Sequence, residues 1–217
     1  GASSTSARRT DALARPRAAD YDDKRRQLLH ACADLFARQG YDRTSINDIA
    51  AACGVSKALI YHYYPNKEQL LVDIIRRHLK DLLEAVETAA ARSGDRDRLA
   101  AIVAALLEAY RDADALHKIQ VNELSRLPAG PQEELKAVER QLVTIFSGAL
   151  VHAVPALKGS ALLKPVTMSL FGMLNWHYMW FRPEGPMSRE AYSDLATRLI
   201  LAGARDLVAA DRRIAAA

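Results

Sequence analysis

The stretch "GVSKALIYHYYPNKEQL", residues 54–70, decides how this chain is expected to fold. The glycine at its start suits a tight turn, and Ser56 can cap a short helix that Pro65 ends. Four rings follow one another inside that helix, from Tyr61 to Tyr64. Where each ring points is therefore the first question that the sequence raises.

The short helix is expected to have two different faces, because successive residues turn by about 100°. The outward face carries a lysine, a small residue and two rings: Lys57, Ala58, Tyr61 and His62. The inward face continues from Val55 with Ile60, Tyr64 and part of Tyr63. Periodicity alone fits equally well with a helix that is only packed in a core.

Two further short helices are expected before this one. The first ends at Gly40, a left-handed position, and carries apolar residues at helical spacing: Leu28, Cys32, Leu35 and Phe36. The second starts behind Ser45, whose side chain can form a capping box with Asp48, and its apolar positions are Ile46, Ile49, Ala50 and Cys53. Three short helices with a tight turn before the last follow the helix-turn-helix plan.

The rest of the chain shows helical periodicity and almost no strand pattern. Asn66 can cap a long helix directly after Pro65. Later helices are separated by Gly- and Pro-containing breaks at residues 91–95, 127–131, 154–160 and 182–188. We therefore expect an all-α chain of about nine helices.

Positive charge is concentrated in the first third of the chain. Residues 1–67 contain eleven basic and seven acidic residues, which accounts for the whole net charge of +4. This asymmetry favours a polyanion as the partner of the N-terminal region. Residues 1–20 are expected to be a flexible basic tail. Its arginines either reach a neighbouring minor groove or only solubilise the chain: Arg8, Arg9, Arg15 and Arg17.

Several classes of protein and site are not supported by the sequence. No apolar run approaches the roughly 20 residues of a membrane span and no signal peptide is visible, so a cytoplasmic location is expected. An enzyme is not expected, because phosphate-loop, nucleophile-elbow and paired-carboxylate patterns are missing.

No metal or cofactor is expected either. Cys32 and Cys53 lie on apolar helical faces and are interpreted as reduced core residues. The six histidines show no metal-ligand spacing. His62 is assigned to a partner, and five are expected at the core edge or the surface: His30, His78, His117, His152 and His177.

Residues 34–71, "DLFARQGYDRTSINDIAAACGVSKALIYHYYPNKEQLL", resemble the DNA-binding region of the TetR family of transcriptional regulators. Cys53, where alanine is commoner, and Tyr64, often phenylalanine, are small departures at core positions. The resemblance implies a homodimer that places residues 56–63 in the major groove of a palindromic operator. It also implies a C-terminal domain that binds a small effector and thereby releases DNA. The expected division is therefore 1–20, 21–66 for DNA binding, and 67–217 for effector binding and dimerisation.

The expected DNA contacts follow from the outward face of the short helix. Lys57 can donate to guanine or phosphate, and Ala58 allows contact with a thymine methyl group. Hydroxyl groups, a second lysine and the free N–H groups at two helix starts can hold phosphates. The predicted DNA-binding residues are Thr44, Ser45, Ser56, Lys57, Ala58, Tyr61, His62, Tyr63 and Lys67.

The last two helices of each TetR-type subunit usually form the dimer interface, and here the predicted interface residues are Trp180, Leu195, Leu199, Ala202, Gly203 and Asp206. Packing within one chain is the alternative. Residues 171–188, "FGMLNWHYMWFRPEGPMS", resemble a subset of the family that regulates fatty-acid or aromatic-acid catabolism and often senses acyl-CoA thioesters.

The family pocket lies among the central helices, so the candidate ligand-binding residues are Leu106, Tyr110, Ile119, Asn122, Glu123, Phe146 and Trp176. Asn122 and Glu123 fit solvent-facing positions equally well, and the aromatic residues fit a core or an interface. The expected function is a repressor that a small lipophilic effector, such as an acyl-CoA, releases from its operator. The alternatives are a repressor of an efflux or stress operon that senses drug-like ligands, or a ligand-independent DNA-binding dimer.

Overall fold

The computed structural model describes the backbone of residues 6–215 and the side chains of residues 21–210. All regular structure in this part of the chain is helical, which confirms the expected fold class. The helices are α1 (Ser6–Gln39), α2 (Ile46–Cys53), α3 (Lys57–Tyr63), α4 (Lys67–Arg92), α5 (Arg98–Ala109), α6 (Asp114–Glu123), α7 (Ala129–Ala153), α8 (Leu163–Asn175), α9 (His177–Trp180) and α10 (Arg189–Ala215), with short 3₁₀ turns at Leu124–Arg126 and Pro155–Leu157. None of these helices is long and apolar enough to cross a membrane.

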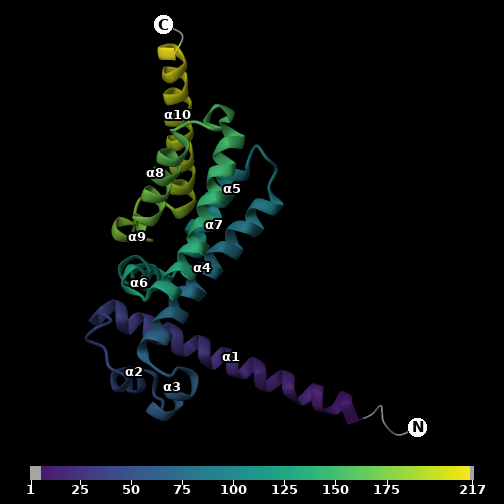
Figure 1. Ribbon diagram of the computed structural model, residues 1–217, viewed down its shortest axis with the longest axis vertical. Helices are drawn as coiled ribbons and strands as arrows, with labels where there is room; N and C mark the ends of the chain where they lie inside the picture. Colours follow the sequence, from purple (N-terminus) through teal and green to yellow (C-terminus); the bar gives the residue numbers. More distant parts are fainter. Residues whose placement is uncertain (1–5, 216–217) are drawn as a thin grey trace.

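The N-terminal unit forms as its local signals predict. Gly40 and Gly54 adopt left-handed backbone angles, with φ of 88° and 62°, where a glycine avoids the steric cost of a side chain. Ser45 and Asp48 form the full capping box at the start of α2. Ser56 caps α3 by accepting from the backbone N–H of Leu59. These local contacts set the directions of α2 and α3 below α1 (Figure 1).

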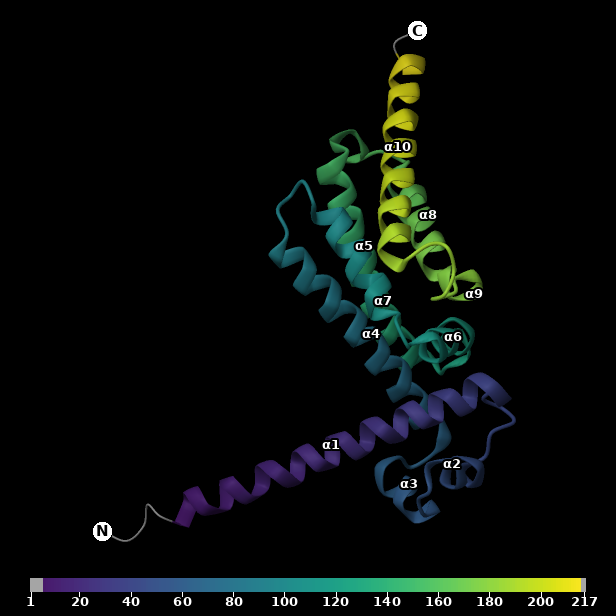
Figure 2. The same ribbon diagram turned by 180° about the vertical axis from the view of Figure 1, so that it is seen from behind.

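Two hydrophobic clusters lie one above the other along the molecule. The lower cluster joins α1, α2 and α3 to the first half of α4 and to residues of α6 and α7, so the N-terminal unit shares its core with the helices above it. The upper cluster joins the second half of α4 with α5, α7, α8 and α10. Helix α4 contributes residues to both clusters. Figure 2 shows it running from the N-terminal unit up to the helices above.

Two helical boundaries differ from the sequence-based expectation. The sequence predicts one helix between the breaks at residues 154–160 and 182–188, but it is interrupted at Trp176, which ends α8 and precedes the single turn α9. Residues 6–20, predicted as part of a flexible tail, continue α1 as helix and project away from the body (Figure 1). Alanine, leucine and arginine favour helix, and the packed second half of α1 provides the nucleus from which the helix extends. Residues 1–5 lie outside the described part, as do the side chains of the four arginines.

The two cysteines are free and lie in the lower cluster, Cys32 buried and Cys53 half-buried. Burial raises the pKa of both thiols, which keeps them protonated and poorly reactive.

Candidate nucleic-acid interface and effector region

Helix α3 divides its side chains as predicted. Lys57, Ala58 and His62 are exposed, and Tyr61 is 47% exposed, whereas Ile60 is completely buried. The outward face therefore presents a cation, a small residue and two polar rings without a covering element. Leu59, which the sequence reasoning left unassigned, is also 38% exposed and enlarges this face by an apolar contact surface.

The remaining two rings of α3 hold the helix to its domain. Tyr63 is half-buried and packs against the Tyr21 ring of α1, with ring centres 4.8 Å apart. Tyr64 is buried, and its hydroxyl group donates a hydrogen bond to the Asp73 carboxylate of α4, to which Arg25 of α1 also donates. Burial alone would raise the pKa of Asp73, but these hydrogen bonds outweigh it and hold the pKa below its ordinary value.

Thr44 and Lys67 have partners inside the domain. The Thr44 hydroxyl group is buried and donates to the carbonyl oxygen of Gly40 at 2.8 Å. The Lys67 ammonium group donates to the carbonyl oxygens of Tyr41 and Thr44 and lies 4.3 Å from the centre of the Tyr41 ring. These contacts fix the turn between α1 and α2, so the predicted phosphate contacts of the two side chains stay predictions. Ser45 and Ser56 are exposed at the starts of α2 and α3.

The seven candidate ligand-binding residues are not gathered in one place. Leu106, Tyr110 and Phe146 are buried in the upper cluster, while Ile119 belongs to the lower one. Asn122 and Glu123 line a groove of about 220 Å³ between α6 and the end of α1, and Trp176 is 59% exposed. Ile119 lines the same groove as Asn122 and Glu123, so the candidates fall into a buried group in the upper cluster, a group at this groove, and the exposed Trp176.

A buried polar cluster lies where α4, α5, α6 and α8 meet. The Tyr110 hydroxyl group donates to the side-chain oxygen of Asn175 at 2.8 Å, and Nε2 of His117 lies 3.1 Å from the backbone oxygen of Asn175. The His117 ring packs against Tyr110 at 4.5 Å between centres and against Tyr178 at 5.2 Å. His78 of α4 lies beside both, with its ring centre 6.0 Å from that of His117.

The sequence does not predict this cluster. His78, His117 and His177 were expected at the core edge or the surface, but they are only 2%, 1% and 2% exposed. Burial lowers the pKa of all three, to about 3 for His78 and about 4 for His177, so they are neutral at ordinary pH. The regular spacing of His78 with the apolar residues of α4 was the available signal. The described residues contain no group of three or more ligands that could hold a metal ion.

Helix α6 connects this cluster with the N-terminal unit. Lys118, next to His117, donates to the carbonyl oxygen of Ala37 at the end of α1, at 3.2 Å. Arg126, in the turn after α6, pairs with Asp42 between α1 and α2 at 2.6 Å. These two contacts link α6 and the turn after it to the segment that leads into the helix-turn-helix.

Comparisons with known proteins agree with this arrangement. The profile "Bacterial regulatory proteins, tetR family" matches residues 28–74, and the profile "Tetracyclin repressor-like, C-terminal domain" matches residues 92–204, which is about half of the chain. The chain belongs to the TetR family. TetR-family proteins are DNA-binding transcriptional regulators and not enzymes, which confirms the expectation from the sequence.

Several TetR-family relatives cover most of the chain. A regulator from Bordetella parapertussis is 35% identical, with a TM-score of 0.77 over 82% of this chain and 93% of its own. The structure of AibR in complex with isovaleryl coenzyme A and operator DNA is 27% identical in sequence, with a TM-score of 0.71 over 81% of this chain and 97% of the AibR chain. The repressor KstR2 of Rhodococcus jostii is 27% identical over 83% of this chain and 90% of its own. The activator FasR of Mycolicibacterium smegmatis is 34% identical over only 40% of each chain.

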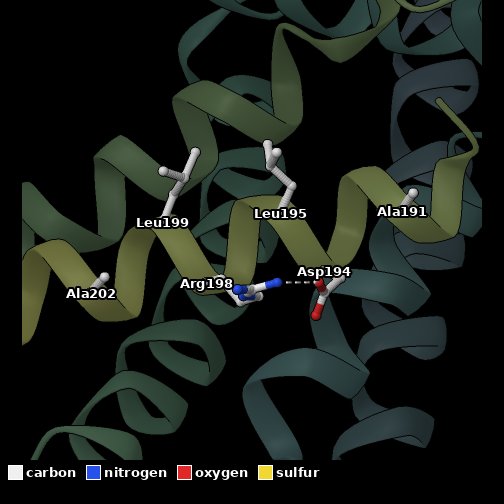
Figure 3. Close-up of a pocket in the computed structure, with 6 residues that line it drawn as sticks. All are labelled: Ala191, Asp194, Leu195, Arg198, Leu199 and Ala202. Carbon is white, nitrogen blue, oxygen red and sulfur yellow. Dashed lines mark hydrogen bonds and ion pairs between the residues drawn. The ribbon is translucent and has the colours of Figure 1, made fainter. Parts of the chain in front are cut away.

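The face of α10 that the TetR-family resemblance assigns to dimerisation is exposed in the single chain. Leu195 and Leu199 are 39% and 57% exposed, and they line a shallow groove of about 510 Å³ together with Ala191, Asp194, Arg198 and Ala202 (Figure 3). Gly203 and Asp206 are exposed further along α10. Trp180 is 48% exposed and, with Met168, Trp176 and Met179, extends the apolar surface over α8 and α9.

Proposed function

We propose that this TetR-family chain is a homodimeric transcriptional repressor that binds a palindromic operator through α3 and is released by a small lipophilic effector. The exposed face of α3 carries this proposal. Lys57 and Tyr61 have no covering element there, while Ile60 and Tyr64 anchor the helix from behind. A rigidly held helix with free polar donors is what a major-groove reader requires.

The dimer follows from the exposed surface of α8–α10. Its apolar residues come from α8, the α8–α9 junction, α9 and α10: Met168, Trp176, Met179, Trp180, Leu195 and Leu199. Apolar surface exposed in this way is unfavourable in a free monomer and favours association. A second copy of the chain, related by a two-fold axis, covers the same surface on both subunits and places two α3 helices for two half-sites.

Effector control is supported by the position of α6. Its buried side contributes His117 to the polar cluster, and its other side holds Ala37 through Lys118. A ligand that separates the residues of the cluster must move α6, and α6 then moves the end of α1. This shift changes the relation of the two α3 helices, which weakens operator binding if the ligand prefers the shifted state.

The effector class is proposed as an acyl-CoA or another lipophilic metabolite. The relative AibR was solved with isovaleryl coenzyme A, and the candidate region of this chain combines an apolar core with few polar groups. A drug-sensing repressor remains the second candidate, because the same apolar core fits lipophilic drug-like molecules. The proposed location of the regulator is the cytoplasm.

Operator selection from a random DNA library tests the DNA-binding part, and the selected operator then serves in a release assay. Acyl-CoAs, free acids and lipophilic cations are added to the complex, and the operator Kd is measured by fluorescence anisotropy at fixed salt. Release by one of these classes supports effector control. An operator Kd that no compound or cell extract changes would leave a ligand-independent dimer. A reporter gene behind the operator distinguishes repression from activation.

A further inference from the structure

Two imidazole nitrogens in the buried polar cluster have no hydrogen-bond partner among the described protein groups. They are Nε2 of His78 and Nδ1 of His117, and both histidines are at most 2% exposed. A polar atom buried without a partner costs free energy, so such atoms mark positions at which another molecule donates or accepts. No contact assigned so far to DNA binding or dimerisation uses these nitrogens.

The hydrogen-bond roles at His117 follow from its neighbour. The backbone oxygen of Asn175 can only accept, so Nε2 of His117 carries the proton and donates to it. Because the neutral ring has a single N–H group, Nδ1 of His117 is a bare acceptor and requires a donor. Burial lowers the pKa of this ring, which favours the neutral form with that assignment.

The neighbouring nitrogen completes the pattern. Nε2 of His78 can carry a proton, and the His78 ring packs edge-on against the His117 ring with the ring centres 6.0 Å apart. A carboxylate only accepts and leaves Nδ1 of His117 facing a second acceptor. A hydroxyl group or a secondary amide both donates and accepts, which suits both nitrogens at once.

We propose that His78 and His117 form the polar anchor of the effector site and bind an uncharged group that both donates and accepts a hydrogen bond, a hydroxyl or a secondary amide, in preference to a carboxylate. The hydroxyl can belong to a lipophilic alcohol, and the amide to the pantetheine arm of a CoA thioester. The anchor presupposes the effector-responsive regulator proposed above and specifies the chemistry that this regulator recognises.

The competing occupant is a structural water molecule. His78 also lines a cavity of about 20 Å³ between α1, α4 and α6, which is large enough for about one water molecule. A larger ligand therefore has to displace side chains of the cluster. His117 lies on α6 next to Lys118, so this displacement acts on the helix that holds the end of α1.

A set of four probes with one skeleton tests the anchor by isothermal titration calorimetry on the full-length dimer. The probes are 4-phenylbutan-1-ol, N-methyl-4-phenylbutanamide, 4-phenylbutyl methyl ether and 4-phenylbutyrate. The alcohol or the amide is expected to bind at least about 10-fold more tightly than the ether and the carboxylate, the effect of about one net hydrogen bond. Tighter binding of the alcohol indicates a lipophilic alcohol as the effector, and tighter binding of the amide indicates the pantetheine arm of a CoA thioester.

His117→Leu is the specific variant, because leucine removes the acceptor nitrogen Nδ1 and offers no other acceptor in its place. It is expected to lose the roughly 10-fold preference. The matched control is His152→Leu on the exposed side of α7, which is expected to retain it. If His117→Leu does not fold, the wild-type probe series still decides.

Three results would overturn the anchor: no binding of the alcohol and the amide, equal or tighter binding of the ether or carboxylate, or an unchanged preference in His117→Leu. The first result leaves water as the occupant of the site, and the second shows that the bound group is not recognised as both donor and acceptor. Operator binding by the wild-type protein is measured separately without probes. Loss of that binding contradicts the proposed regulator, whereas intact operator binding with a failed probe series contradicts the anchor alone.

Discussion

Ile60 and Tyr61 are adjacent in sequence, but their replacement by alanine should affect different properties. Ile60 is completely buried in the lower cluster, and Ile60→Ala removes three carbon atoms from that core. At about 0.8 kcal/mol for each carbon, the transfer term is about 2.4 kcal/mol, and the cavity left behind raises the expected loss to about 2–5 kcal/mol. Tyr61 is 47% exposed, so Tyr61→Ala should leave the free energy of unfolding nearly unchanged.

Operator binding should show the reverse pattern when it is compared at a temperature where both variants are folded. Tyr61→Ala is expected to weaken binding by about 1–3 kcal/mol, roughly 5- to 150-fold, because it removes a contact to DNA. Urea denaturation followed by circular dichroism measures stability, and fluorescence anisotropy on the selected operator measures affinity. If Ile60→Ala folds with wild-type stability while Tyr61→Ala unfolds, the assignment of the two faces of α3 is reversed and the proposed DNA contact fails.

Three further predictions concern the network behind α3, the dimer and the buried histidines. Tyr64→Phe removes a donor to the Asp73 carboxylate and should reduce the free energy of unfolding by about 1–3 kcal/mol. Tyr61→Phe, the exposed control, should leave it unchanged. If Tyr64→Phe is as stable in urea as the wild-type protein, this hydrogen bond does not have the proposed role. Leu199→Glu places a charge on the α10 face and should shift the chain from dimer to monomer in analytical ultracentrifugation. Val121→Glu, the control at a 50% exposed site on α6, should stay dimeric. A dimeric Leu199→Glu variant would mean that the interface lies elsewhere. Burial lowers the pKa of His78 to about 3, so between pH 6 and 4 the unfolded chain binds a proton at this residue that the folded chain does not. The free energy of unfolding therefore decreases as the pH is lowered from 6 to 4. The contribution of His78 is about 1.4 kcal/mol per pH unit, and a His78→Gln variant with the wild-type pH slope would refute it.

The sequence was sufficient to predict the helix-turn-helix, because each of its local signals is made by residues that lie close together in the chain. The capping box of Ser45 and Asp48 and the left-handed Gly54 depend on short-range backbone geometry. The two faces of α3 follow from the helical period, which the chain carries in its order of residues. The family resemblance then provided what periodicity could not, namely a dimer and an effector domain.

Contacts between distant segments were decided only by the tertiary structure. Lys67 donates to residues that lie 23 and 26 positions away in the chain. Asn175, which accepts from both His117 and Tyr110, lies 58 positions from the first and 65 from the second. Helical spacing says which side of a helix is apolar, but not which neighbour covers a polar residue on that side. His78 and His117 therefore looked like edge residues in the sequence although they are buried, while the ligand contacts predicted for Asn122, Glu123 and Trp176 stay predictions. The sequence by itself determined the helices and the exposed side of α3, while the packing of α4, α5, α6 and α8 determined which polar groups are buried together, because burial depends on all four helices at once.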